Sequence, residues 1–211
     1  MAPDFNPIAR LYYPLSRLVF GSSQLRAQQT FVHLVGPGSR ILIAGGGNGH
    51  LLRYLPESCA AASEIFFVEP APDMMAMARK KTVPSPHIHF IQTTVEQFLG
   101  SSGPDFDVVI TAFFFDLFPQ HEAGSLFSLI NARLRPGGLW LYTDFQLAGG
   151  SLWWQAPLLK MMYFFFRQVS EVKASFLPDM AGCWKNRYRL LAGRSFYGRF
   201  IIAQAWQKNP V

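Results

Sequence analysis

A run of apolar residues that leads directly into a glycine-rich stretch constrains the fold of this chain more than any other feature. The run is Ile41–Ala44, and the stretch is Gly45-Gly46-Gly47-Asn48-Gly49. A continuous apolar run is typical of a strand buried in a parallel sheet. Glycines allow a sharp turn and a close approach of the backbone to a ligand. A helix-like pattern follows at 51–55, so the sequence predicts a nucleotide-type site at the carboxyl edge of an open α/β sheet.

The spacing of the glycines discriminates between nucleotide-binding motifs. A dinucleotide fingerprint requires G-x-G-x-x-G. Counted from Gly45 and Gly47, its third glycine falls on His50, and counted from Gly46, its second falls on Asn48. The spacing G-x-G-x-G is satisfied by Gly45, Gly47 and Gly49, which argues against a dinucleotide site.

An acidic residue ends the next predicted strand. The pattern Glu64–Glu69 reads as this strand, and Glu69 lies 20 residues beyond Gly49. A carboxylate at this place can accept hydrogen bonds from both hydroxyls of a ribose. A Met- and Ala-rich helix is predicted to follow at 72–81.

The glycine loop and the strand-end acid resemble the motifs of class I S-adenosylmethionine (SAM)-dependent methyltransferases that act on small molecules. The resemblance covers roughly residues 38–145, and Leu134–Leu139 is similar to the family's Leu-Lys-Pro-Gly-Gly turn. It implies SAM as the cofactor and S-adenosylhomocysteine as the product. In the family the glycine loop wraps the amino-acid end of SAM and the acid holds the ribose. The cofactor-binding residues implied here are Gly45, Gly46, Gly47, Asn48, Gly49, Glu69, Pro70, Thr94, Val95, Thr111, Phe113 and Tyr13.

Two positions depart from the family pattern. Ile43 stands where the first motif often carries an acid, so Arg10 or Tyr13 is a candidate for the carboxylate end of the cofactor. Thr94 replaces an aspartate that usually meets the adenine amino group. The Thr94 hydroxyl or the Val95 backbone is therefore expected to make the adenine contact.

The order of apolar patterns alternates between strands and helices, which is typical of a parallel sheet. Further strands are predicted at 40–44, 87–92, 106–111 and 139–143, with a last strand within 198–206, and 177–191 reads as a helix or a strand. Helices are predicted near 5–20, 24–35, 120–134 and 153–170.

The expected fold is a Rossmann-like, doubly wound α/β sheet of seven mainly parallel strands with one antiparallel strand near the C-terminus and helices on both faces. We expect a single domain, 1–211, with an N-terminal helical cap at 1–37 and a substrate-side helical insertion at 145–187.

Composition narrows the setting and the partners. Half of the 211 residues are hydrophobic and 15% are charged, as in a globular domain with a substantial core. Two cysteines, Cys59 and Cys183, make no disulfide framework, and no signal peptide or membrane span is evident, so we expect a cytoplasmic protein. His87 and His89 share a strand face without a third ligand, so no metal is expected.

The net charge of +6 leaves the nature of the partners open. Basic and aromatic residues interleave at 184–199, a pattern that occurs in nucleic-acid-binding proteins but more often in solvated strands, so nucleic-acid binding is disfavoured. The apolar patch Met161–Phe166 has two interpretations. It is either a peripheral contact with an anionic membrane or a dimer face. We expect a monomer or a homodimer.

Methyl transfer from a sulfonium requires mainly alignment and exclusion of water, and a base only where the acceptor loses a proton. The candidate catalytic residues are His121, Asp116 and Asp144, which lie at or after the ends of the fourth and fifth strands. Aromatic and methionine residues favour a small apolar or aromatic acceptor: Phe114, Phe115, Trp153, Trp154, Met161, Met162 and Phe165. Two alternatives remain, a non-catalytic SAM-binding protein and an enzyme resembling aminopropyltransferases, which use decarboxylated SAM.

Overall fold

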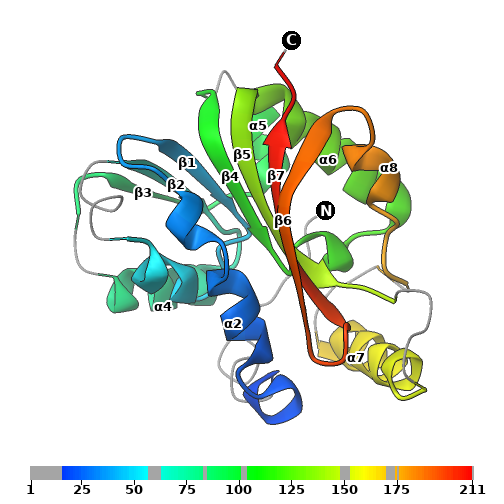
Figure 1. The fold of residues 1–211 in the computed structure, drawn as a ribbon. Coiled ribbons are helices and arrows are strands. Elements are labelled where there is room, and N and C mark those ends of the chain that lie inside the picture. The colour runs from blue at the N-terminus through cyan, green and yellow to red at the C-terminus, as the bar shows by residue number, and fades with distance from the viewer. Residues whose placement is uncertain are drawn as a thin grey trace.

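A seven-stranded sheet organises the structure, a computed structural model that describes residues 16–56, 63–82, 85–100, 104–147, 153–169, 174 and 176–210. The strand order is β3-β2-β1-β4-β5-β7-β6 (Figure 1). The strands are β1 (Arg40–Ala44), β2 (Glu64–Val68), β3 (Ile88–Ile91), β4 (Phe106–Ala112), β5 (Leu134–Phe145), β6 (Tyr188–Phe196) and β7 (Ile201–Lys208). Strands β1 to β5 pair in parallel, and β7 pairs antiparallel with both β5 and β6. The order reverses between β1 and β4, which makes their carboxyl ends the topological switch point, where ligands bind in open α/β sheets.

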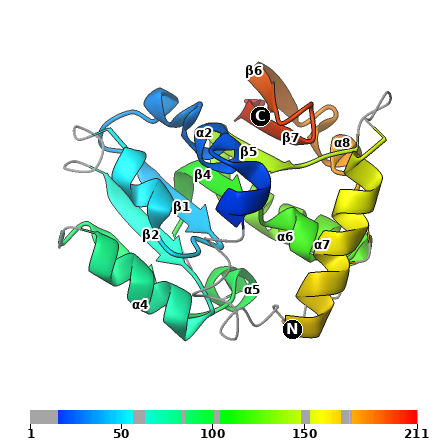
Figure 2. The same cartoon turned by 90° about the horizontal axis from the view of Figure 1, so that it is seen from below.

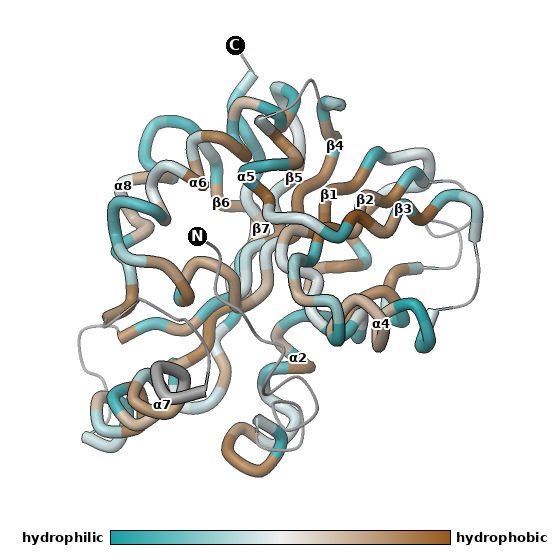
Figure 3. The backbone as a smooth tube through the Cα atoms, turned by 180° about the vertical axis from the view of Figure 1, so that it is seen from behind, coloured by the Kyte–Doolittle hydropathy of each residue, from teal (hydrophilic) through white to brown (hydrophobic). Residues whose placement is uncertain are grey.

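Helices cover both faces of the sheet because its central strands are apolar on both sides. Ile41 and Ile43 pack in one buried cluster with the helix α4, whereas Leu42 and Ala44 pack in another with α5 and α6. Figure 3 shows β1 and β4 as the hydrophobic centre of the molecule. The α-helices are α2 (Ser23–Gln29), α4 (Pro72–Lys81), α5 (Val95–Gly100), α6 (Gln120–Arg133), α7 (Gln155–Val169) and α8 (Ala181–Trp184). Short 3-10 helices are η2 (Val32–Leu34), η3 (His50–Tyr54) and η4 (Phe115–Leu117).

A third buried cluster joins α7 to the strand ends. It includes Leu159 and Tyr163 from α7, Phe145 from the end of β5, and Phe200 from the β6–β7 turn. Phe20, in a helical stretch just before α2, packs against Phe145 with the two rings tilted and their centroids 5.2 Å apart. Figure 2 shows α2 toward the viewer over β1 and β4, and α7 toward the viewer in front of α6. This end of the molecule is therefore the one that frames a ligand site.

The predicted fold class is confirmed, including β7 as the strand that runs against the other six in the described sheet. The predicted bounds of β1 and of α4 are those of the structure. The open segment 177–191 holds α8 and the start of β6. Helices α7 and α8 occupy the region expected as the substrate-side insertion. Of the expected N-terminal cap at 1–37, residues 1–15 lie outside the described residues, and the rest holds α2 and η2.

The helix-like segment after the glycine loop is the five-residue 3-10 helix η3. Two expectations about local structure were wrong. The helix expected at 24–35 ends at Gln29. The expected turn at 135–138 is part of β5, where the register with β4 shifts between Phe106 and Val108. Gly137, at φ +75°, takes the left-handed conformation that this irregular stretch requires.

Candidate functional site

The glycine loop after β1 owes its shape to positive φ angles and to close backbone packing. Gly45, Gly47 and Gly49 have φ of +65°, +58° and +75°, which L side chains rarely adopt. A Cβ on Gly45 would lie 2.6 Å from the Phe114 ring, and a Cβ on Gly49 would lie 2.7 Å from the Cα of Ala78. A Cβ on Gly47 would meet no atom within 4 Å. Gly45 and Gly49 therefore lack a side chain because neighbouring atoms pack against them, whereas Gly47 faces open space.

Glu69 connects the glycine loop to the start of α4. Its Oε2 accepts a hydrogen bond from the Gly47 amide at 2.8 Å, and its Oε1 accepts one from the Ala71 amide at 2.9 Å. The side chain is buried, and this burial raises the pKa of Glu69, while the two amides favour the ionised form. Each carboxylate oxygen keeps a lone pair for a ligand, and Glu69 lines the adjoining cavity.

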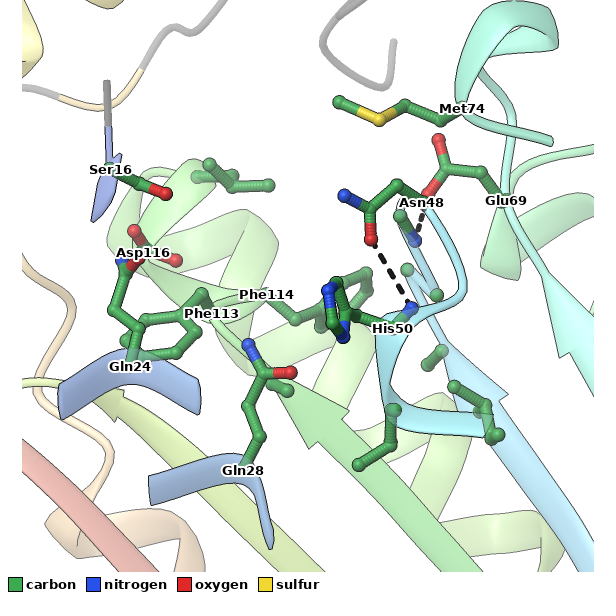
Figure 4. Close-up of a pocket in the computed structure, with 18 of the residues that line it drawn as sticks. Ser16, Gln24, Gln28, Asn48, His50, Glu69, Met74, Phe113, Phe114 and Asp116 are labelled. Carbon is green, nitrogen blue, oxygen red and sulfur yellow. Dashed lines mark hydrogen bonds between the residues drawn. The ribbon is translucent and has the colours of Figure 1, made fainter. Parts of the chain in front are cut away.

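A cavity of about 170 Å³ lies between the glycine loop, the end of β4 and the helical residues 16–29 (Figure 4). Gln24 and Gln28 face it from α2, opposite Asn48 and His50. Sequence reasoning missed these two glutamines. The only available signal was their spacing of four residues, which also occurs on ordinary solvated helices.

Most of the residues expected to hold the cofactor line this cavity. They are Gly45, Gly46, Gly47, Asn48, Glu69, Pro70, Thr94, Val95 and Phe113. Gly49 turns toward Ala78 instead, and Tyr13 and Arg10 lie outside the described residues. The Thr111 hydroxyl accepts a hydrogen bond from the Trp140 indole at 3.0 Å inside the core, so its position gives it a structural role apart from the cavity.

Asp116 and Asp144 form a buried carboxyl pair. Asp116 belongs to η4 and lines the cavity, and Asp144 lies at the end of β5, where it accepts hydrogen bonds from the Phe115 and Phe145 amides at 3.1 and 2.8 Å. Burial raises the pKa of Asp116 to about 7 and raises that of Asp144 well above its usual range, to which the neighbouring Asp116 also contributes. Because two adjacent carboxylates repel, the pair holds at least one proton over much of the neutral range.

One oxygen of this pair has no hydrogen-bond partner in the part of the chain that the structure describes. Asp116 Oδ1 is buried and accepts no hydrogen bond among the described residues. The Tyr163 hydroxyl from α7 donates instead to the Asp116 backbone carbonyl at 3.0 Å, which fixes the loop from below. A buried, unpartnered carboxylate oxygen beside a cavity is suited to accept a proton from a ligand.

His121 lies apart from the cavity. Its side chain is 81% exposed, on the first turn of α6, and its Nε2 is 3.8 Å from Glu122. It lines a separate surface depression with Glu122 and Ser125. The sequence placed His121, Asp116 and Asp144 in one group, but the structure brings together only the two aspartates.

Some of the apolar residues expected to line the acceptor pocket do line the cavity, and others are exposed to solvent. Phe114 lines the cavity, together with Phe118 and Phe145, which the sequence did not single out. Trp153 and Met161 are 86% and 56% exposed, so the insertion supplies fewer of the lining side chains than expected. Among the described residues, no group of three or more His, Cys, Asp or Glu side chains is arranged to bind a metal ion.

The cavity residues fit a nucleoside cofactor with an amino-acid tail. Gly47 leaves room that a Cβ would fill, and its positive φ exposes the loop backbone. Glu69 offers carboxylate lone pairs at the end of β2, the place of a ribose ligand in α/β nucleotide sites. Val95, the first residue of α5, and Thr94 before it line the same cavity.

Comparison with known proteins agrees with this geometry. Residues 41–138 match the family model described as a methyltransferase domain. A search of curated protein sequences finds no match. The N-methyltransferase NodS from Bradyrhizobium japonicum WM9 has a similar structure, with a TM-score of 0.63 and 12% identity over 88% of this chain and 97% of that chain.

Two further solved structures share the fold. Magnesium protoporphyrin IX methyltransferase from Synechocystis PCC 6803, solved with bound S-adenosylhomocysteine, gives a TM-score of 0.65 at 15% identity over 96% of both chains. The mitomycin 7-O-methyltransferase MmcR gives 0.69 at 12% identity over 97% of this chain and 60% of that chain. The resemblance to class I SAM-dependent methyltransferases predicted from the sequence is thus confirmed by the family-model match over residues 41–138, and the solved structures share the fold.

Proposed function

We propose that this protein transfers a methyl group from SAM to a small apolar or aromatic acceptor that carries a hydroxyl or amino group. The observation that carries the proposal is the cavity itself, which is lined at once by the open face of Gly47, the buried Glu69 and Asp116, whose Oδ1 has no partner among the described residues. The matching methyltransferase domain and the methyltransferase neighbours support the reaction class.

The cofactor would be held by residues from three elements. The backbone of Gly45–Gly47 would contact the amino-acid end, Glu69 would accept hydrogen bonds from the ribose, and Thr94 and Val95 would border the adenine. When bound, SAM supplies an electrophilic methyl group on a sulfonium. Glu69 must be ionised to accept from two hydroxyls, and its two backbone amide donors favour that state.

The acceptor would lie between Asp116 and the aromatic side chains at the end of β4. Phe113, Phe114 and Phe118 give this part of the cavity an apolar wall, which excludes water and aligns a flat acceptor. Asp116 Oδ1 would take the proton that the hydroxyl or amine loses as its oxygen or nitrogen bonds to the methyl carbon. Burial would raise the pKa of Asp116, and a hydrogen bond with the Asp144 carboxyl would offset part of that rise.

A radiolabelled-methyl assay tests the proposal. The full chain is incubated with methyl-labelled SAM and a panel of phenols, quinols and aromatic amines, beside the variants Asp116→Asn and His121→Ala. We expect a product from at least one acceptor class, a loss of about 100-fold or more in kcat for Asp116→Asn, and near wild-type activity for the exposed His121→Ala.

Two other outcomes would contradict parts of the proposal. If the chain binds SAM but methylates no member of the panel, the result favours the alternative of a non-catalytic SAM-binding protein. If Asp116→Asn turns over as fast as wild type, Asp116 is not the base.

A further inference from the structure

Helix α7 is mainly apolar on the side that faces solvent over residues 155–165, the part whose side chains the structure describes. The exposed positions there are Ala156, Pro157, Lys160, Met161 and Phe164, which recur every three to four residues and so form one face of the helix. Phe164 is 66% exposed and Met161 is 56% exposed. The opposite face is buried through Leu159 and Tyr163. A helix on a protein surface normally turns polar residues outward, so an apolar outer face indicates contact with something other than water.

More exposed apolar side chains flank this helix in the sequence and at its end of the molecule. Trp153, just before α7, is 86% exposed, and Phe176, after it, is 76% exposed. Leu18, in the helical stretch before α2, is 83% exposed. Figures 1 and 3 place that stretch and α7 at the same end of the molecule, where both project beyond the sheet. These side chains, with Met161 and Phe164, are the five most exposed large apolar side chains among the described residues.

The exposed charged side chains in the described segments 16–22, 153–165 and 197–200 are positive. Lys160 is exposed on the outer face of α7 itself, Arg17 is exposed beside Leu18, and Arg199 is exposed in the β6–β7 turn. That turn contacts the start of α7, since the Gln155 side chain donates to the Gly198 carbonyl at 2.6 Å. The segments 16–22, 153–165 and 197–200 contain no Asp or Glu. An apolar face bordered by basic side chains is complementary to anionic lipid headgroups above an acyl layer.

The same charges disfavour a second copy of this chain as the partner. In a twofold dimer the same patch contributes from both subunits, so Lys160 and its basic neighbours would face their own copies. The helix is also too short to cross a bilayer, and within the described ranges no helix has the length and apolarity to do so. An orientation in the plane of the interface satisfies both the apolar face and the charges.

We propose that the outer face of α7, with Trp153 and Leu18, binds the surface of an anionic lipid bilayer. Met161, Phe164 and Trp153 enter the boundary between headgroups and acyl chains, and Lys160, Arg17 and Arg199 contact lipid phosphates. Arg17 and Ser16 also line the cavity described above, so this orientation brings the cavity close to the membrane surface. The binding surface requires neither SAM nor an acceptor, so it stands apart from the proposed methyl transfer.

Vesicle co-sedimentation tests this surface with the full chain. The vesicles contain phosphatidylcholine alone or phosphatidylcholine mixed with phosphatidylglycerol. The test variant is Met161→Glu/Phe164→Glu. The matched control is Leu190→Glu/Leu191→Glu, which replaces two exposed apolar residues of β6 that are 46% and 44% exposed. Both double variants change the charge equally, and circular dichroism establishes that each is folded.

We expect wild type and the control to bind the anionic vesicles, more weakly as salt increases, and the α7 variant to bind at least about tenfold more weakly. Three results would overturn the proposal. They are an absence of wild-type binding to anionic vesicles, equal binding by the α7 variant and the control, and a wild-type dimer in light scattering that only the α7 variant abolishes.

Discussion

At the scale of single residues, the glycine loop separates packing from ligand binding. Gly47 and Gly49 have similar positive φ angles, but only Gly49 lies against neighbouring atoms, those of Ala78 in α4. The motif G-x-G-x-G therefore predicted the loop correctly while giving its glycines a single role. The third glycine holds the loop against a helix, and the second leaves space beside Glu69.

This difference predicts unequal losses of stability. Gly47→Ala incurs only the strain of a left-handed alanine, about 1 kcal/mol of unfolding free energy. Gly49→Ala adds a clash with the backbone of α4, and we expect a loss of about 3 kcal/mol in total. Urea unfolding followed by circular dichroism measures both values. Equal losses for the two variants would show that the packing of Gly49 against Ala78 is not tight.

The buried carboxyl pair makes stability depend on pH. Because the pKa of Asp116 is about 7 in the folded chain and lower in the unfolded chain, the folded state binds more protons between these values. Stability is therefore highest below the unfolded pKa and falls as pH rises toward 7, by up to about 1.4 kcal/mol per pH unit for one proton. Burial of Glu69 adds a contribution of the same sign.

Replacement of Asp116 by asparagine tests this dependence. An asparagine side chain does not ionise, so we expect the unfolding free energy of Asp116→Asn to vary less between pH 4 and pH 8 than that of wild type, with the contributions of Glu69 and Asp144 remaining. Chemical denaturation at a series of pH values gives the slope. A slope as steep as that of wild type would mean that Asp116 is already ionised across this range.

At the scale of helices and strands, local patterns predicted what local forces determine. The apolar run of β1 and the proline-initiated helix α4 were placed at their correct bounds, because burial on both faces and Pro72 at the helix start act over a few residues. The bulge in β5 at 135–138 was predicted as a turn, because its pairing with β4 depends on residues almost 30 positions away. The helix-like pattern at 51–55 could not reveal that η3 is a 3-10 helix of only five residues.

The end of α6 depends on a side chain from the last strand. Lys208 Nζ donates to the carbonyls of Asn131 and Leu134, both at 2.6 Å, where the helix passes into β5. A cation at a helix C-terminus satisfies carbonyls that have no partner within the helix. We expect Lys208→Met to lower the unfolding free energy by about 1 to 2 kcal/mol. Thermal denaturation of this variant beside the exposed Lys185→Met measures the effect, and an equal loss in both would contradict it.

At the scale of the whole molecule, the sequence predicted the sheet, its switch point and most of the cavity residues, because all of these follow the ends of consecutive strands. It could not pair Asp116 with Asp144, which come from two strand ends 28 positions apart. It also missed Gln24 and Gln28, since only the folded chain brings α2 over the glycine loop. The contacts that distinguish this site are thus those between distant segments.

Calorimetric titration with SAM and S-adenosylhomocysteine tests the central claim most directly, since it requires no knowledge of the acceptor. Wild type is compared with Gly47→Val, which fills the open side of the loop, and with the exposed control His121→Ala. We expect both compounds to bind wild type and His121→Ala, and to bind folded Gly47→Val at least about tenfold more weakly. An absence of wild-type binding at millimolar SAM, or equal affinity in Gly47→Val, would contradict the assignment of this cavity to the cofactor.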